Sequence, residues 1–390
     1  MHDQGTGKSQ PVQAAGMHAC TCSATANHKR GRGEEMRRAD KVSYARAMMS
    51  CVLAMGGAQV CAEESWVKLS GFVDISVERL AQSGKGGSVY RVSSGQLSAS
   101  RINFSGQEVL SSDLKAIFTY EPQFSADTGT AAAQARQSFI GLHSNKFGVL
   151  TMGRQNTPSY WIAGYADPSF SADYSMVSNM QFFYAAYRVD NSIQYNTPRL
   201  YGFMGRFMVT TGLEDTTRAG RYLSTGIEYR DDKLYAGFVS DLRYTRNINN
   251  AGSVPSSRDN YASLAYKFGD FEPTLVYHTY NGYYAYPPYA DFQSKGWDIQ
   301  IGARYRLNPT NRFYASFVHR KDDNNTKLSD ANGFVLGYIY SLSKRSEIYA
   351  TYAHVQHKHD SPIRYPVTFS ATPTSQQNPS GMAIGIRHAF

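Results

Sequence analysis

The sequence predicts an all-β chain that forms a sixteen-stranded antiparallel transmembrane β-barrel. Three observations lead to this prediction. Apolar and polar residues alternate over repeated segments of about ten residues, which is the two-residue period of a strand with two different faces. Short turns alternate with long loops along the chain. Tyr, Phe and Gly are abundant, at 29, 20 and 33 of 390 residues, as expected of barrel strands with aromatic girdles.

The first 62 residues have the pattern of an export leader. All four cysteines, Cys20, Cys22, Cys51 and Cys61, lie there. Basic residues precede an apolar stretch from Ala47 to Ala58, and Val60-Cys61-Ala62 reads as a cleavage site. We therefore expect residues 1–62 to be an N-terminal extension and signal peptide, with Met36 as the natural start and cleavage after Ala62. Residues 63–390 are expected to be the barrel. A lipid-attachment box before Cys61 is the less favoured reading.

The charge of the expected mature chain does not favour nucleic-acid binding. Residues 63–390 contain 32 Lys and Arg against 27 Asp and Glu, and both signs are spread along the whole length. A nucleic-acid-binding protein would gather its basic residues on one face or arm. The same residues contain no apolar run that approaches the ~18 residues of a membrane helix.

The alternation is clearest in two segments. In residues 67–78, Val67, Leu69, Val73, Ile75 and Val77 fall on one face, and Lys68, Ser70, Asp74, Ser76 and Glu78 on the other. In residues 297–306, the apolar or aromatic side chains of Trp297, Ile299, Ile301, Ala303 and Tyr305 oppose a polar set that ends with Arg304 and Arg306. A soluble sandwich also alternates, so the connections must decide between the two folds.

The connections favour a membrane barrel. Short turns are expected at 145–148, 231–232 and 308–310, and long loops at 81–97, 156–187, 246–259 and 358–378. Tight turns on one side and extended loops on the other are typical of outer-membrane barrels. About sixteen strands account for the length, and an even number closes an antiparallel sheet with no unpaired edge in lipid.

The chain resembles the general porins of β-proteobacteria, a family that includes the trimeric porins of Bordetella- and Neisseria-like bacteria. The motifs that carry the resemblance are Leu69-Ser-Gly-Phe-Val-Asp74, Ser100-Arg-Ile-Asn-Phe-Ser-Gly106, Leu114-Lys-Ala-Ile-Phe-Thr-Tyr-Glu121, Arg136-Gln-Ser-Phe-Ile-Gly-Leu142, Leu150-Thr-Met-Gly-Arg-Gln155, Asp190-Asn-Ser-Ile-Gln-Tyr195 and Phe390. Their order and spacing are specific, whereas each motif alone is weak.

The resemblance implies a homotrimer in the Gram-negative outer membrane, in contact with membrane lipid and lipopolysaccharide. It also implies that the third outer loop, Asn156–Tyr187, folds inward and narrows the pore. This loop is unusually rich in aromatic residues. Phe390 would supply the terminal aromatic residue that the barrel-assembly machinery reads.

Strand parity and the resemblance together indicate where a constriction would lie. Arg101 is opposite in parity to Ile102 and Phe104, and Arg136 is opposite to Phe139, so both arginines should face the lumen. By the family motif, these two and Arg188 correspond to a basic cluster at the constriction. Arginine suits this place because its guanidinium stays charged beside other cations.

The other candidate residues have less specific roles. Glu121, which shares the parity of Lys115, is expected as an acidic group on the wall, and Asp167 and Asp173 as the facing negative side. For Lys115, Arg154, Arg206 and Arg304 we favour the plainer interpretation of lumen residues balanced by a carboxylate. No metal site is expected from His354, His357 and His359, because the first two fall on opposite faces of a strand.

We therefore expect a channel for passive diffusion of small hydrophilic solutes and anions, with weak anion preference, no cofactor and no catalytic residues. The first alternative is a porin selective for sugars, phosphate or aromatic acids, which the aromatic third loop motivates. An adhesive barrel with a plugged lumen and a membrane-embedded hydrolase are less favoured. The hydrolase would need a serine, a histidine and an orienting group on one face, and parity favours no such set.

Overall fold

The computed structural model describes residues 64–81, 87–170, 172–182, 185–245, 253–283, 293–324, 329–358, 364–368 and 378–390. The chain divides into two compact units, Met1–Cys61 and Ala62–Phe390. The predicted leader, its start at Met36 and its cleavage after Ala62 all lie outside the described residues, as does His359. Within the described part, no helix is long and apolar enough to cross a membrane.

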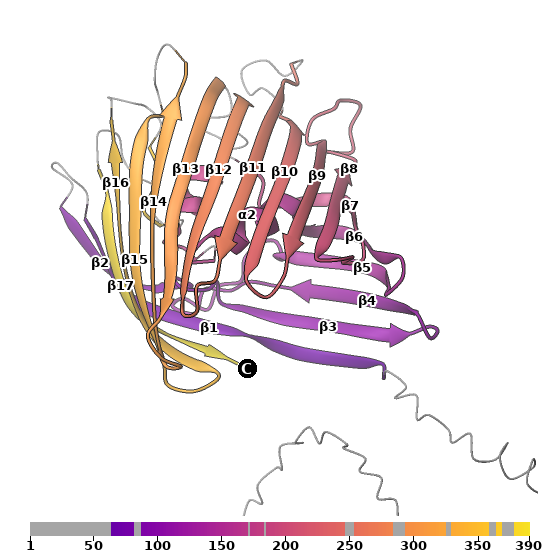
Figure 1. The fold of residues 1–390 in the computed structure, drawn as a ribbon, viewed down its shortest axis with the longest axis horizontal. Coiled ribbons are helices and arrows are strands. Elements are labelled where there is room, and N and C mark those ends of the chain that lie inside the picture. Colours follow the sequence, from indigo (N-terminus) through magenta and orange to yellow (C-terminus); the bar gives the residue numbers. More distant parts are fainter. Residues whose placement is uncertain are drawn as a thin grey trace, which may run out of the picture. The chain divides into compact units, whose positions relative to one another are not determined.

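Almost all of the described chain is strand (Figure 1). Seventeen strand segments form one sheet in this part of the protein. The segments are β1 (Trp66–Ala81), β2 (Ser88–Ser94), β3 (Arg101–Val109), β4 (Leu114–Glu121), β5 (Gln137–Ser144), β6 (Gly148–Asn156), β7 (Arg188–Asn196), β8 (Phe203–Thr210), β9 (Tyr222–Arg230), β10 (Leu234–Tyr244), β11 (Ser256–Tyr266), β12 (Phe271–Tyr283), β13 (Gln293–Arg306), β14 (Asn311–Asp322), β15 (Ala331–Ser341), β16 (Ser346–His357) and β17 (Ser380–Ala389).

The sheet closes on itself through β1. One edge of β1 pairs with β17, from Phe72↔Ala389 to Ala81↔Ser380. Its other edge pairs with β3 along the first half and with β2 along the second half. Segments β2 and β3 are therefore two parts of one interrupted strand. In the described residues the result is a closed antiparallel barrel of sixteen strands, which confirms the predicted fold class.

The two faces of the strands differ as the alternation predicts. In β1, Val67 and Val77 are 63% and 64% exposed, whereas Asp74 and Glu78 are fully buried inside the barrel. The apolar side chains therefore face outward, toward lipid, and the polar ones face the lumen. This is the reverse of a soluble protein, because the outer surface of such a barrel meets hydrocarbon and its lumen is polar.

Short and long connections alternate as predicted, but several differ from the predicted bounds or were not predicted. The expected turns at 145–148, 231–232 and 308–310 all lie between paired strands. The expected loop 81–97 is too long, because β2 continues the pairing with β1 as far as Ala81↔Ser88. The expected loop 246–259 likewise overlaps β11, which begins at Ser256. Further long connections were not predicted, namely residues 122–136, residues 211–221 and those from β12 to β13 and from β14 to β15.

The third long loop folds into the barrel, as the resemblance implied. It contains a helix, α2 (Pro158–Ala166), and a π-helical turn, η1 (Val177–Gln181), and nearly all of their residues are buried. Figure 1 shows α2 within the curve of the sheet. Thr157 caps the helix by accepting a hydrogen bond from the Tyr160 backbone N–H at 3.2 Å. The same hydroxyl donates to the carbonyl of Ala186 at 2.9 Å, which ties the two ends of the loop together.

The loop packs on one side of the lumen wall. Ile162 belongs to a buried apolar cluster with Val239, Tyr261 and Val276 of β10 to β12. A side chain at Gly226 or Gly237 would meet Ile162 at 2.7 or 2.8 Å, so these glycines let the helix approach the wall closely. A second buried cluster joins Tyr174, Met176 and Met180 of the loop to Val318, Val335 and Ala353 of β14 to β16.

Candidate pore constriction

Two arginines on the part of the wall formed by β3 to β5 share one carboxylate. The Arg136 Nε donates to the Oε1 of Glu121 at 2.8 Å, and the Arg101 Nε lies 3.6 Å from its Oε2. These residues come together because β3 and β4 are neighbours and Arg136 directly precedes β5. Glu121 is thus an acidic member of the basic cluster, which still holds an excess of positive charge.

Arg188 begins β7 at the base of the inward loop. Its guanidinium carbon lies 5.8 Å from the ring centre of Tyr160 in α2. Its Nε is buried and has no hydrogen-bond partner among the described residues. A buried guanidinium N–H of this kind gains a hydrogen bond when an anion or a water molecule comes close.

Asp173 of the inward loop lies on the other side of this space. It is held there by residues 95–100, which interrupt the strand between β2 and β3. Between β2 and β3, residues 95–100 leave the ladder at Gly95, whose positive φ of 86° few other residues adopt. The buried carboxylate of Asp74 accepts from the backbone N–H groups of Leu97 and Ser98, at 3.0 and 2.7 Å. The Asp173 N–H donates to the carbonyl of Gln96 at 3.1 Å, so the interruption also holds the inward loop.

Together these groups line a cavity of about 220 Å³. Arg101, Arg136 and Arg188 contribute from the wall, and Asp173, Tyr160 and Phe170 from the loop. Of the eight predicted constriction residues, the structure brings together Arg101, Arg136, Arg188, Glu121 and Asp173. Low-dielectric walls strengthen the field of such charges, so this cavity is the point of the lumen where three guanidinium groups act together.

Lys115 and Arg154 do not line this cavity. Lys115 is at the turn end of β4, six residues before Glu121 and therefore about 20 Å away along the strand. Arg154 pairs with Ser138 on the same face of the sheet as Ile140 and Met152, which are 65% and 49% exposed, so it lies near the cluster but on the outward face of β6, not in the lumen as predicted. It donates to Asp190 at 2.6 Å and to the carbonyl of Ala135 at 2.7 Å. Arg206 and Arg304 also pair with carboxylates, Glu228 and Glu272, as expected for balanced lumen residues.

Asp167 is not part of the cavity. It ends α2, is fully buried, and accepts hydrogen bonds from Ser169 and from the Ser175 hydroxyl, the latter at 2.6 Å. Its carbonyl accepts from Arg304, which also donates to the carbonyl of Tyr165 at 2.8 Å. Asp167 therefore shapes the loop. Strand parity gives no information in a loop, so the sequence could not distinguish Asp167 from Asp173.

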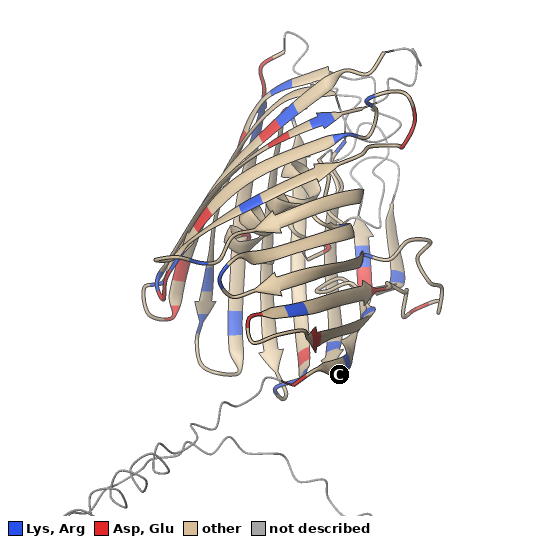
Figure 2. Cartoon of the chain, turned by 90° about the vertical axis from the view of Figure 1, so that its right-hand side faces the viewer, with Lys and Arg blue, Asp and Glu red and all other residues tan. Residues whose placement is uncertain are grey.

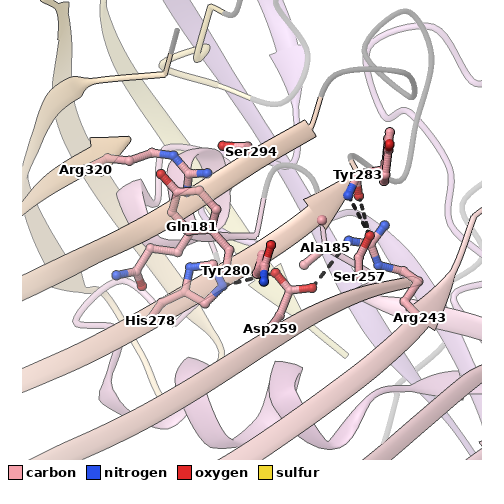
Figure 3. A pocket seen from close by; sticks show the side chains of 12 residues that line it. Gln181, Ala185, Arg243, Ser257, Asp259, His278, Tyr280, Tyr283, Ser294 and Arg320 are labelled. Atoms are coloured by element: carbon pink, nitrogen blue, oxygen red, sulfur yellow. Dashed lines mark hydrogen bonds and ion pairs between the residues drawn. The ribbon is translucent and has the colours of Figure 1, made fainter. Parts of the chain in front are cut away.

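A second polar cluster lies where the loop meets β10 to β14, and sequence reasoning missed it (Figure 3). The two ring nitrogens of His278 lie 2.9 Å from Asp298 and 3.2 Å from Asp259. Arg320 donates to Asp298 at 2.7 Å, and Arg243 to Asp259 at 3.3 Å. The space between these residues is only about 20 Å³, room for a single water molecule.

This cluster anchors the loop. The ring of His278 stacks on Tyr261 at 4.1 Å, and Tyr261 stacks on Phe182 of the loop at 4.6 Å. The Tyr261 hydroxyl donates to the carbonyl of Gln181 at 3.3 Å. Alternation places Asp259, His278, Asp298 and Arg320 on inward faces, and only the register of four strands, which the sequence does not reveal, makes them neighbours.

Figure 2 shows that basic and acidic residues are spread over many strands, as the sequence predicts. A family model described as Gram-negative porin matches residues 47–360. The chain belongs to this family of outer-membrane channels. Outer membrane porin protein 32 of Delftia acidovorans is 26% identical over 364 residues, which cover 87% of this chain and 97% of the relative. An outer membrane porin protein of Bordetella pertussis is 25% identical and covers 76% of this chain and 83% of its own length.

A solved structure of similar fold is the anion-selective porin from Comamonas acidovorans. Its TM-score with this protein is 0.74 at 22% identity, and the match covers 84% of this chain and all of that one. The chain is therefore an outer-membrane barrel protein that forms a channel.

Proposed function

We propose that this porin is a general diffusion channel with a weak preference for anions, and that small solutes pass through the cavity lined by Arg101, Arg136 and Arg188. The observation that carries the proposal is the arrangement of charge there. Three guanidinium groups lie near two carboxylates, Glu121 and Asp173, so these five groups have a net positive charge. The Comamonas porin of similar fold is anion-selective, which is consistent with this assignment.

The size of the effect is modest. Two unit charges 4 Å apart interact by about 1 kcal/mol in water and about 4 kcal/mol near a protein surface. A tenfold preference for anions needs only about 1.4 kcal/mol. One uncompensated guanidinium in a partly hydrated cavity is therefore enough, and a strong selectivity is not expected.

The proposal includes a homotrimer held in the outer membrane and surrounded by its lipids, including lipopolysaccharide. Family membership supports the trimer. The outward apolar residues of the strands, such as Leu264 and Ile301, which are 45% and 58% exposed, support lipid contact.

The test is the reversal potential of single channels in a planar bilayer under a KCl gradient. Arg101→Gln, Arg136→Gln and Arg188→Gln should each lower the anion-to-cation permeability ratio, by roughly fivefold at most, since each removes about 1 kcal/mol of attraction in water. Lys115→Gln is the matched control, because it removes the same charge from the lumen wall about 20 Å away. Equal permeability ratios in all four variants and the wild type would overturn the proposal.

A second candidate is a channel that prefers aromatic acids. The observation that favours it is the presence of Tyr160, Phe170 and Tyr187 beside the arginines in the same cavity. Aromatic faces and guanidinium groups together bind planar carboxylates. Saturable block of the current by benzoate, with no block by acetate at the same concentration, would support this candidate over general diffusion.

A further inference from the structure

The outward face of the barrel carries a polar hollow where hydrocarbon contacts are expected. It has a volume of about 600 Å³ and lies over β10 to β13, toward the ends of β12 and β13 that a long loop connects. Long loops mark the outer side of such barrels. The hollow therefore lies at the level of the outer leaflet, outside the lumen.

Two rows of residues cross this face from strand to strand. The upper row is Leu242, Arg258, Asn281 and Lys295, each paired with the next across the ladder. The lower row is Asn260, Thr279, Trp297 and Lys321. Neighbouring strands are about 4.8 Å apart, so the Cα atoms of Arg258 and Lys295 are about 10 Å apart, with only Asn281 between them.

The cations of the upper row are available to a ligand on the surface. Lys295 is exposed, and the Arg258 side chain is exposed apart from a hydrogen bond that its NH1 donates to the Ser240 hydroxyl at 3.0 Å. Asp323 lines the rim as well, and its backbone N–H donates to the Lys295 carbonyl at 2.8 Å. The lining of the hollow therefore contains two cations, Arg258 and Lys295, and one carboxylate, and Lys321 follows Trp297 in the lower row.

The face becomes apolar immediately below these rows. The next row contains Phe238, Tyr277 and Ile299, and Tyr277 lies 6.2 Å from Trp297, centre to centre. Tyr and Trp favour the boundary between headgroups and acyl chains, and long basic side chains at this height reach toward the headgroups. The hollow thus has a cationic upper rim and an aromatic floor.

We propose that this hollow binds the phosphorylated headgroup of an outer-leaflet lipid. A phosphate between Arg258 and Lys295 would accept charge-assisted hydrogen bonds from both. An acyl chain of the same lipid would lie along Trp297 and Tyr277. A bound lipid, and not free phosphate, is the occupant because the rim and the floor match the two parts of one amphiphile. The proposal depends on the membrane location of the barrel and is independent of the ion preference of the pore.

The experiment is native mass spectrometry of the full porin, purified from outer membranes and titrated with lipid A carrying two phosphates. The double variant Arg258→Gln/Lys295→Gln should bind this lipid about thirtyfold more weakly, at roughly a fivefold loss for each cation near a membrane surface. Lys344→Gln/Arg345→Gln is the matched control, because it removes the same charge from the short turn between β15 and β16. It should leave the affinity unchanged.

Two further arms identify the ligand. Dephosphorylated lipid A should bind the wild type as weakly as the intact lipid binds the double variant, and millimolar inorganic phosphate should not displace bound lipid. Equal binding of lipid A to the wild type and the double variant, equal binding of the phosphorylated and dephosphorylated lipids, or displacement by phosphate would overturn the proposal. The double variant should keep the wild-type reversal potential, which separates a failure here from a failure of the pore assignment.

Discussion

Glu121 shows how a single residue sets the character of the pore. Its carboxylate accepts from Arg136 at 2.8 Å and lies 3.6 Å from Arg101, so it holds both guanidinium groups on the wall and cancels part of their charge. Removal of the carboxylate should free both arginines to act on solutes.

We predict that Glu121→Gln increases the anion-to-cation permeability ratio by roughly fivefold, because about 1 kcal/mol of repulsion toward anions is lost in a hydrated cavity. Reversal potentials under a KCl gradient measure it. Glu272→Gln, which removes the partner of Arg304, is the control with the same change of charge. A ratio that falls in Glu121→Gln would contradict this role.

A second prediction at the residue scale concerns a turn. Asp113 lies in the short turn between β3 and β4, where the Ser144 hydroxyl donates to it at 2.6 Å, and this hydrogen bond holds the pKa of the carboxyl below its usual value of about 3.9. The carboxylate therefore stabilises the folded state at pH values above about 3.9, and this contribution disappears as the pH falls through the lowered pKa.

We expect Asp113→Ala to unfold at a lower temperature than the wild type at pH 7, with the difference vanishing in acid. Thermal unfolding in detergent at pH 7 and pH 2 measures it. Asp232→Ala, which removes a carboxylate from another short turn, is the control. An equal difference between Asp113→Ala and the wild type at both pH values would refute the assignment.

At the scale of elements, the inward loop is held mainly by contacts with the wall. The Tyr174 hydroxyl donates to the buried Glu78 at 2.6 Å, on the side of the barrel opposite the Phe182–Tyr261–His278 stack. Glu78 also accepts from Arg91 and Ser93, so it remains partly satisfied when one donor is lost. The loop is thus fixed at two separate points.

We predict that Tyr174→Phe makes the loop fluctuate without unfolding the barrel. Loss of a hydrogen bond to a charged group costs about 1.5 to 3 kcal/mol, and the freed loop should produce brief partial closures in single-channel records. Tyr338→Phe loses a hydrogen bond to Asn311 on the outward face and is the matched control. Steady currents in Tyr174→Phe, equal to those of the control, would show that Glu78 does not fix the loop.

The sequence predicted the elements well where a period of two is visible. Alternation in β1 and β13 was enough to assign their faces, and parity correctly pointed Arg101 into the lumen. For Arg136 the parity argument was wrong, because Phe139 shares the inward face of Lys115, whereas Ile140 and Leu142 face outward. Arg136 reaches Glu121 from the connection before β5. Prediction from alternation failed where the backbone leaves the hydrogen-bonded ladder. The break at residues 95–100 depends on Gly95 and on hydrogen bonds to Asp74, and neither leaves a periodic signal. The same reason explains why Asp167 and Asp173 could not be told apart.

At the scale of the whole molecule, closure of the barrel depends on the last strand. The Phe390 N–H donates to the Gly71 carbonyl at 3.2 Å, and the Gly71 N–H donates to the Phe390 carbonyl at 3.1 Å. These two bonds extend the pairing of β1 with β17 to the last residue. A side chain at Gly71 would meet the Phe390 ring at 2.6 Å, so the glycine leaves room for it.

We predict that Phe390→Ala lowers the amount of folded porin in the outer membrane of cells, because the resemblance to general porins implies that the terminal aromatic residue is a signal for the assembly machinery. The same variant should refold in detergent nearly as well as the wild type. Heat-modifiable migration on gels measures both. Phe313→Ala, at another outward aromatic residue, is the control. Normal membrane levels of Phe390→Ala would argue against the signal.

At the scale of the whole molecule, strand register explains which parts of the site could not be predicted from the sequence. The cluster of Asp259, His278, Asp298 and Arg320 exists only because the four strands β11 to β14 have one particular register. A shift of one residue in any pair would turn these groups toward lipid. Alternation gives the face of each residue but not its neighbours across the sheet.

The central claim is that ions pass through the cavity beside Arg136, and one measurement tests it most directly. The chain from Glu63 to Phe390 contains no cysteine, so Arg136→Cys provides a single thiol there. Reaction with a negatively charged methanethiosulfonate reagent should reduce the current in one step per channel and shift the reversal potential toward cation preference. Ala262→Cys, on the outward face of β11, is the control. Unchanged current and potential after complete labelling of Arg136→Cys would contradict the account.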